Sequence, residues 1–186
     1  ILAGIAISAL AGAFTSLVLN LAPNPWAANE IVFWMMGSLA DRSWLHVALA
    51  CPFILIGAGI LLSQGRALDA LTLGEDAAES LGLRLSHVRL WLVLGTAAVV
   101  GAGVAVAGAV GFVGLVVPHL LRPLVAGRPS VLLIASALGG AGLVLAADVA
   151  VRVLLPTGDL KLGVLTALVG APLFLHLIWK MRRGQI

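Results

Sequence analysis

The segment from Leu90 to Leu121 contains no formally charged side chain. As a single α-helix, rising 1.5 Å per residue, it would be about 48 Å long, whereas the hydrocarbon core of a bilayer is about 30 Å thick. The segment therefore predicts one complete membrane crossing, a break, and a shorter piece. The glycines of GAVGFVG are the predicted break, between a span over Leu90–Ala109 and a short helix over Val113–Val125.

The composition agrees with a membrane protein. Of the 186 residues, 61% are hydrophobic and 10% are charged, whereas soluble domains carry about 25% charged residues. A soluble fold of this length could not cover so much apolar surface. We therefore expect an all-α, polytopic transmembrane helical bundle. The net charge of +3 does not indicate nucleic-acid binding, because the basic residues stand singly at the ends of apolar runs.

Other apolar runs bring the expected number of membrane segments to about six. These further runs are Ile1–Ala22, Leu45–Ser63, Val131–Val153 and Val164–Trp179. A cytoplasmic C-terminus places eight Lys and Arg inside and three outside, in agreement with the positive-inside rule. Because the chain begins without methionine inside an apolar run, we expect an N-terminally truncated protein without a signal peptide.

The most polar internal stretch, LTLGEDAAESLGLRLSHVRLW, lies between the second and third spans. Thr72 followed by Glu75 predicts a capping box at the start of a short helix. Gly82 suits the C′ position at its end. A capped helix in a cytoplasmic loop, over residues 64–88, indicates a docking element for a cytoplasmic partner. A solvated linker is the alternative interpretation.

Two features lie toward the opposite side of the membrane. After the first span, Ile31–Met36 predicts a short helix at the membrane surface or a re-entrant piece. Near the outer end of a later span, Asp148 and Arg152 stand four residues apart, so they share a helix face and are expected to pair. An exposed Arg152 could instead meet an acidic partner outside.

Small residues recur every four positions on two of the spans. Such spacing allows helix backbones to approach closely in lipid. On the first span it could also form a wall of a translocation pathway. The positions are Gly4, Ser8, Gly12 and Ser16 on the first span and Gly101, Ala105 and Ala109 on the third.

The sequence contains no constellation typical of an enzyme. It has no HExxH, GxSxG or P-loop motif and no paired intramembrane aspartates. His119 has no second ligand nearby in the sequence, so we expect no metal site. An ion-coupled secondary transporter would need carboxylates near the midplane of the membrane. Asp148 lies toward the end of a span, which disfavours this alternative.

Several stretches, in order along the chain, resemble one family. GAVGFVGLVVPHLLRPLVAG, AADVAVR and GVLTALVGAPLFL are similar to the permease subunit of type II ABC importers for iron-siderophores, haem and cobalamin, the FecCD-like family. TLGEDAAESLGL resembles its cytoplasmic coupling segment and VFWMMGSL its outer segment. The resemblance implies that residues 1–186 form a single permease domain, roughly the last six of ten helices. DLKLG departs from the usual ELPVG-like pattern, with Lys161 in place of proline.

The resemblance also implies a function. The chain would be a permease subunit of an ATP-driven importer in the cytoplasmic (inner) membrane, translocating an iron chelate (siderophore or haem) by alternating access. Cobalamin import is the alternative, and an ion-coupled transporter is a more distant one. Implied partners are cytoplasmic ABC ATPase subunits, which would hold ATP and Mg²⁺, a second permease subunit in a homodimer or heterodimer, a periplasmic or lipid-anchored binding protein, and membrane lipids. No cofactor is expected on this chain.

Individual residues take roles from the same resemblance. Arg152 would meet a carboxylate of the binding protein, and the first span, with Ser8, Gly12 and Ser16, would line the translocation pathway. The helix over Leu73–Leu83 would seat in the ATPase through Leu73, Gly74, Glu75, Asp76, Glu79, Leu81, Gly82 and Leu83. The residues expected to shape the helices are Gly111, Phe112, Gly114, Pro118, His119, Arg122, Gly170 and Pro172.

Several of these shaping residues carry local predictions. Pro118 predicts an extended residue before it and a helix that starts at His119, with Arg122 leading toward the cytoplasmic face. A direct contact of His119 with the substrate is the alternative to this structural role. Gly170 and Pro172 predict a kink in the last span.

Overall fold

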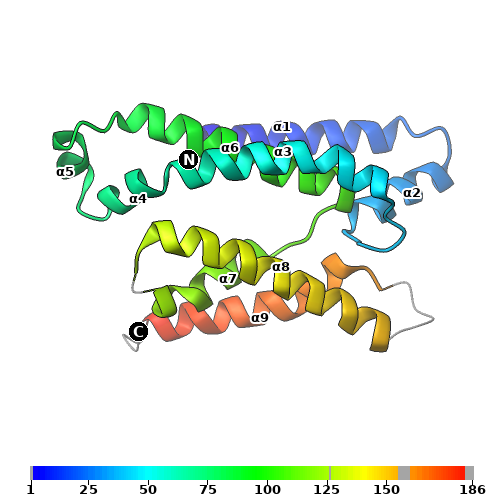
Figure 1. The fold of residues 1–186 in the computed structure, drawn as a ribbon. Helices are drawn as coiled ribbons and strands as arrows, with labels where there is room; N and C mark the ends of the chain where they lie inside the picture. The colour runs from blue at the N-terminus through cyan, green and yellow to red at the C-terminus, as the bar shows by residue number, and fades with distance from the viewer. Residues whose placement is uncertain (1, 126, 155–159, 183–186) are drawn as a thin grey trace. The chain divides into compact units, whose positions relative to one another are not determined.

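The structure, a computed structural model, describes residues 2–125, 127–154 and 160–182. Within these ranges the regular structure is helical and contains no β-strand, which confirms the predicted all-α class. The chain divides into two compact units, residues 1–36 and 37–186, which we describe separately. Figure 1 shows the course of the chain through both.

The first unit contains two helices, α1 (Leu2–Asn20) and α2 (Pro25–Met35). Helix α2 begins well before the predicted Ile31, because Asn24 and Pro25 form a start signal. The Oδ1 atom of Asn24 accepts a hydrogen bond from the Ala27 N–H at 2.8 Å, and Pro25 occupies the first turn, where no N–H is needed.

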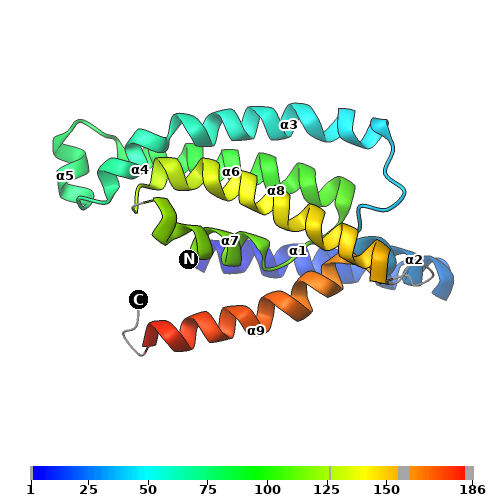
Figure 2. The same ribbon diagram turned by 60° about the horizontal axis from the view of Figure 1, so that its bottom comes forward.

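The second unit contains the remaining helices in two groups. Helices α3 and α6 run side by side, and α7, α8 and α9 pack together (Figures 1 and 2). The elements are α3 (Trp44–Ser63), α4 (Gly65–Leu71), α5 (Glu75–Ser80), α6 (Leu85–Ala107), α7 (Val113–Leu121), the 3₁₀ turn η1 (Arg122–Val125), α8 (Pro129–Leu154) and α9 (Leu162–Arg182).

The predicted membrane segments correspond to these helices. In the described residues, four helical stretches are long and apolar enough to cross a membrane: Leu2–Asn20, Trp44–Ser63, Leu85–Ala107 and Pro129–Val153. Val113–Val125 and Leu162–Leu175 are shorter apolar pieces. Most large apolar side chains on these helices are exposed, for example Leu55 at 65% and Leu145 at 60%. Such surfaces suit contact with lipid tails or with other membrane helices.

Glycines bring α3 and α6 into close contact, but not the predicted ones. A Cβ on Gly57 would lie 2.7 Å from the carbonyl oxygen of Gly95, and a Cβ on Gly95 would lie 2.9 Å from Cγ of Leu61. A Cβ on Gly101 would have no neighbour within 4 Å. The α3–α6 contact therefore uses Gly57 and Gly95 and not Gly101.

The break predicted after the third span is confirmed. Helix α6 ends at Ala107, Gly108 has a positive φ of 74°, and α7 begins at Val113. The prediction that a helix begins at His119 was wrong, because Pro118 lies inside α7. Its ring removes only the hydrogen bond to the carbonyl of Gly114.

Two further contacts order the segments around this break. Phe112 has a φ of 64°, in the left-handed region, and a Cβ on Gly170 of α9 would collide with its side chain. At the other side, the Ser38 N–H donates to the carbonyl of Ala107 at 2.7 Å, and the Gly163 N–H donates to that of Gly37 at 3.1 Å. The turn at residues 37–38 thereby joins the end of α6 to the start of α9.

Candidate functional site: the coupling segment

The candidate coupling segment, residues 64–88, is called the coupling segment below, and it contains a helix that the sequence did not predict. Helix α4 follows α3 with only Gln64 between them, and it ends at Leu71. The next residue, Thr72, is its C-cap, and the Thr72 Oγ1 donates to the carbonyl of Asp69 at 2.7 Å. The predicted capping box of Thr72 and Glu75 was therefore wrong. Thr72 has helical backbone angles, φ −67° and ψ −20°, whereas an N-cap residue needs an extended backbone.

Helix α5 is shorter than the predicted Leu73–Leu83, but its end is as predicted. Gly74, with φ 105°, is the N-cap. At the other end Gly82 has φ 85°, its N–H donates to the carbonyl of Glu79 at 2.8 Å, and the Leu83 N–H donates to that of Ala78 at 3.2 Å. This pair of bonds is a Schellman motif, which confirms Gly82 at C′.

One face of α5 is anchored and the other is open. On the anchored face, Ala78 of α5 is completely buried. Glu75 pairs with Arg89 of α6, with Oε1 and Nη2 2.7 Å apart, but both side chains are about two-thirds exposed. Such a pair contributes about 0–1 kcal/mol. Leu73 and Leu81, 71% and 67% exposed, stand at the two ends of the helix.

The open side of α5 combines these leucines with acidic side chains. Asp76 and Glu79 are both exposed. Between α5 and α6 lies an open hollow of about 630 Å³ with charges of both signs on its walls. The residues that line it are Glu75, Glu79, Gly82, Leu83, Arg84, Leu85, Ser86 and Arg89. A protruding surface of this kind suits a protein partner, since apolar area supplies affinity and charge supplies orientation.

Helix α4 makes a polar contact that sequence reasoning missed. The Asp69 carboxylate accepts from the Ser130 N–H at 2.8 Å and from the Ser130 hydroxyl at 2.6 Å. Ser130 stands in the first turn of α8, so Asp69 caps that helix from another element. These hydrogen bonds, with the nearby Arg128 guanidinium, hold the pKa of Asp69 below its ordinary value of 3.8. The Pro129-Ser130 pair signals a helix start, but nothing local points to Asp69.

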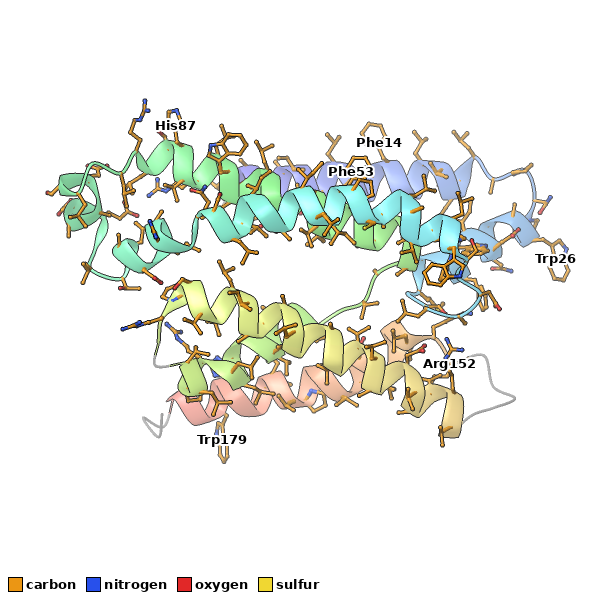
Figure 3. All side chains as sticks on the ribbon, in the orientation of Figure 1. Phe14, Trp26, Phe53, His87, Arg152 and Trp179 are labelled. Carbon is orange, nitrogen blue, oxygen red and sulfur yellow. The ribbon has the colours of Figure 1, made fainter. Side chains whose placement is uncertain are left out.

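The predicted pairing of Asp148 with Arg152 is confirmed. Nε of Arg152 lies 2.8 Å from Oδ2 of Asp148 on α8. The Asp148 side chain is 18% exposed, whereas that of Arg152 is 57% exposed and remains accessible. Arg152 lies at the opposite end of this unit from His87 and Trp179 (Figure 3). The coupling segment and Arg152 therefore belong to opposite ends of the helices.

Other predicted residues have no tested role. Ser8, Gly12 and Ser16 lie on α1, and their place in a translocation pathway stays a prediction. His119 is half-buried in the last turn of α7, and Arg122 is exposed where that helix ends. Over the ranges that the structure describes, no three His, Cys, Asp or Glu side chains gather in a way that could hold a metal ion.

The model of the FecCD transport family matches residues 1–180. The chain belongs to this family. Among FecCD relatives, it is 40% identical over 181 residues to the iron(III) dicitrate transport system permease protein FecD of Escherichia coli K12, covering 97% of this chain and 56% of that protein. It is 41% identical over 185 residues to the hemin transport system permease protein HmuU of Yersinia pestis, covering 100% and 55%.

Two further comparisons place the chain within the family. It is 40% identical over 185 residues to the vitamin B12 import system permease protein BtuC of Vibrio cholerae, covering 100% of this chain and 54% of that one. A solved structure of a metal-chelate type ABC transporter in an inward-facing conformation matches with a TM-score of 0.88 and 35% identity, over 96% and 58% of the two chains. The chain thus spans just over half the length of these relatives.

Proposed function

We propose that this chain belongs to the permease subunit of an ATP-driven importer that carries an iron chelate across the cytoplasmic membrane. The coupling segment is the observation that carries the proposal. It presents exposed leucines and carboxylates at the end of the helices opposite Arg152. In the proposed orientation the coupling segment and the C-terminus face the cytoplasm, and Arg152 faces the side from which substrate arrives.

The proposed mechanism assigns the chain a mechanical role. Two cytoplasmic ATPase subunits bind and hydrolyse ATP with Mg²⁺, and their movement is passed to the coupling segment. Two permease subunits then shift between inward-open and outward-open packings around a shared pathway. A binding protein delivers the substrate at Arg152. The residues of this chain dock, transmit movement and line the route, and they perform no bond-making step.

The relatives support a metal-chelate substrate and leave one second candidate. FecD and HmuU are named for iron(III) dicitrate and hemin, and the structural neighbour is described as a metal-chelate type transporter. We therefore propose an iron chelate such as a siderophore, ferric citrate or haem. Cobalamin is the second candidate, because BtuC of Vibrio cholerae is similarly related.

Docking of the ATPase can be tested on the open face of α5. Leu81→Asp replaces an exposed apolar contact with a charge, so the amount of co-purified ATPase should fall at least about tenfold, which corresponds to about 1.4 kcal/mol. Asn29→Asp, which introduces a negative charge at an exposed position on α2, is the matched control, and this variant should retain the ATPase. Undiminished co-purification of the Leu81→Asp variant would show that the ATPase docks elsewhere.

The orientation is tested by labelling. In a Cys51→Ser background, a cysteine introduced at Asp76 should react with a membrane-impermeant maleimide only after the cells are opened. Labelling of Asp76→Cys in intact cells would place the coupling segment outside and overturn the proposed function.

A further inference from the structure

The coupling segment is attached to the helices at two points of unequal strength. Its α5 end is held to α6 by the exposed Glu75–Arg89 pair, which salt and water weaken. Its α4 end is held to α8 by two hydrogen bonds from Ser130 to the ionised Asp69, in a partly buried position. Hydrogen bonds to an ionised group are roughly twice as strong as neutral ones, and the positive end of the α8 dipole adds to them.

Close packing supports the second attachment. A Cβ on Gly65, at the start of α4, would lie 3.2 Å from Cβ of Ser130 and 3.5 Å from its Cα. The absence of a side chain at Gly65 therefore lets α4 approach the first turn of α8. The contact joins residues 61 positions apart in the chain. Movement of α4 must either carry the start of α8 with it or break this contact.

Helix α8 has the proposed docking residue at its other end. It runs for 26 residues from Pro129 to Leu154, a length of about 39 Å at 1.5 Å per residue. Ser130 lies in its first turn and Arg152 in its last. Because α8 is continuous over this distance, a displacement of its first turn can be passed along the helix to its last turn. Helix α8 therefore connects the coupling segment to the proposed outer surface.

We propose that Asp69 is a positioning residue that attaches the coupling segment to α8. Through this attachment, α8 transmits the effect of binding-protein docking at Arg152 to the ATPase. In the other direction, it transmits the ATP-driven movement of the ATPase to the outer end of α8. This inference rests on the proposed function and adds a route and a residue to it. In this role Asp69 needs no contact with the substrate or with the ATPase. It acts through Ser130, by holding α4 and α8 in one mechanical unit.

The test uses the permease assembled with its ATPase and binding protein in proteoliposomes. For Asp69→Ala, the ATPase should co-purify as with the wild-type protein. The stimulation of ATP hydrolysis by substrate-loaded binding protein should fall at least about fivefold, the lower range of measured couplings between sites. Asp41→Asn removes an exposed carboxylate from a loop outside the segment and should leave the stimulation unchanged.

A second variant separates transmission from simple helix capping. Ser130→Asp places a negative charge in the first turn of α8 itself, where it stabilises the helix without Asp69. The double variant Asp69→Ala with Ser130→Asp should therefore regain thermal stability but not stimulation. Recovery of the stimulation in this double variant would show that Asp69 only caps α8, and it would overturn the proposal.

The remaining outcomes are equally distinct. Loss of ATPase co-purification in Asp69→Ala would make Asp69 a docking residue and refute the transmission role. Stimulation within about twofold of wild type in that variant would refute it as well. Absence of transport or of stimulated hydrolysis in the wild-type assembly would contradict the proposed function instead, since both measurements precede any substitution.

Discussion

The close contact between α3 and α6 makes a sharp prediction about a single methyl group. In Gly57→Ala the new Cβ would lie 2.7 Å from the Gly95 carbonyl oxygen, 2.8 Å from Cγ2 of Val99 and 3.0 Å from Cβ of Ala98. Favourable separations between carbon atoms are about 3.5–4.0 Å. Because a backbone carbonyl is among the atoms in the way, a rotamer change cannot relieve the overlap and the helices must separate.

The magnitude follows from two opposing effects. Forcing an extra methyl into a packed contact costs about 1–3 kcal/mol. Replacing glycine by alanine inside a helix stabilises the folded protein by up to about 1 kcal/mol, because alanine has the higher helix propensity. The net effect for Gly57→Ala should be a loss of about 1–2 kcal/mol. At about 2–4 °C per kcal/mol for a chain of this size, the melting temperature should fall by about 2–8 °C.

The matched control is Gly59→Ala on the same helix. A Cβ on Gly59 would meet nothing within 4 Å, so this variant keeps the propensity gain without the overlap. Thermal unfolding of the purified permease in detergent, followed by tryptophan fluorescence, measures both variants. The reasoning fails if Gly57→Ala melts at or above the wild-type temperature, or if Gly59→Ala is the less stable of the two.

Three further predictions concern other parts of the chain. Gly170→Ala should destabilise the protein because its Cβ collides with Phe112, and the same melting assay should show a smaller loss for Gly170→Ala when it is introduced into a Phe112→Gly background, where glycine also accepts the positive φ. Because the pKa of Asp69 is lowered, the contribution of this carboxylate to folding stability is complete above pH 3.8 and is lost only as the pH falls through the still lower pKa of the folded state. Carboxyl NMR should therefore show no titration of Asp69 between pH 5 and 8, and Ser130→Ala should raise the pKa of Asp69. Arg152→Glu should weaken binding-protein affinity at least about tenfold in a surface-capture assay, whereas unchanged affinity would exclude docking there.

Features that depend on neighbours in the sequence were predictable. The break between α6 and α7 follows from a charge-free stretch that is too long for one crossing and rich in glycine. Gly82 ends α5 because a left-handed residue is needed just there. Asp148 and Arg152 pair because one turn of helix places them together. Each of these arguments needs only the local backbone geometry.

The capping prediction failed for a reason that is also local. Thr72 and Glu75 have the spacing of a capping box, but Thr72 belongs to the end of α4 and is already helical. A helix as short as α4 has too few residues for a periodic signal, and its first residue is glycine. Similarly, Pro118 predicts a helix boundary from the sequence, yet α7 continues through it, with Val116 and Val117 buried just before it.

The amino-acid sequence by itself determined that this chain is a bundle of membrane helices, that its long charge-free stretch breaks between α6 and α7, and which polar loop separates the second and third spans, because hydropathy and turn chemistry act over a few residues. Only the tertiary structure decided which glycines meet between α3 and α6, and that Asp69 reaches Ser130 across 61 positions. In a membrane helix nearly every side chain is apolar, so apolarity cannot mark the face that packs against a neighbour. Which helices come together depends on shape and on a few polar contacts, and these are properties of the folded chain.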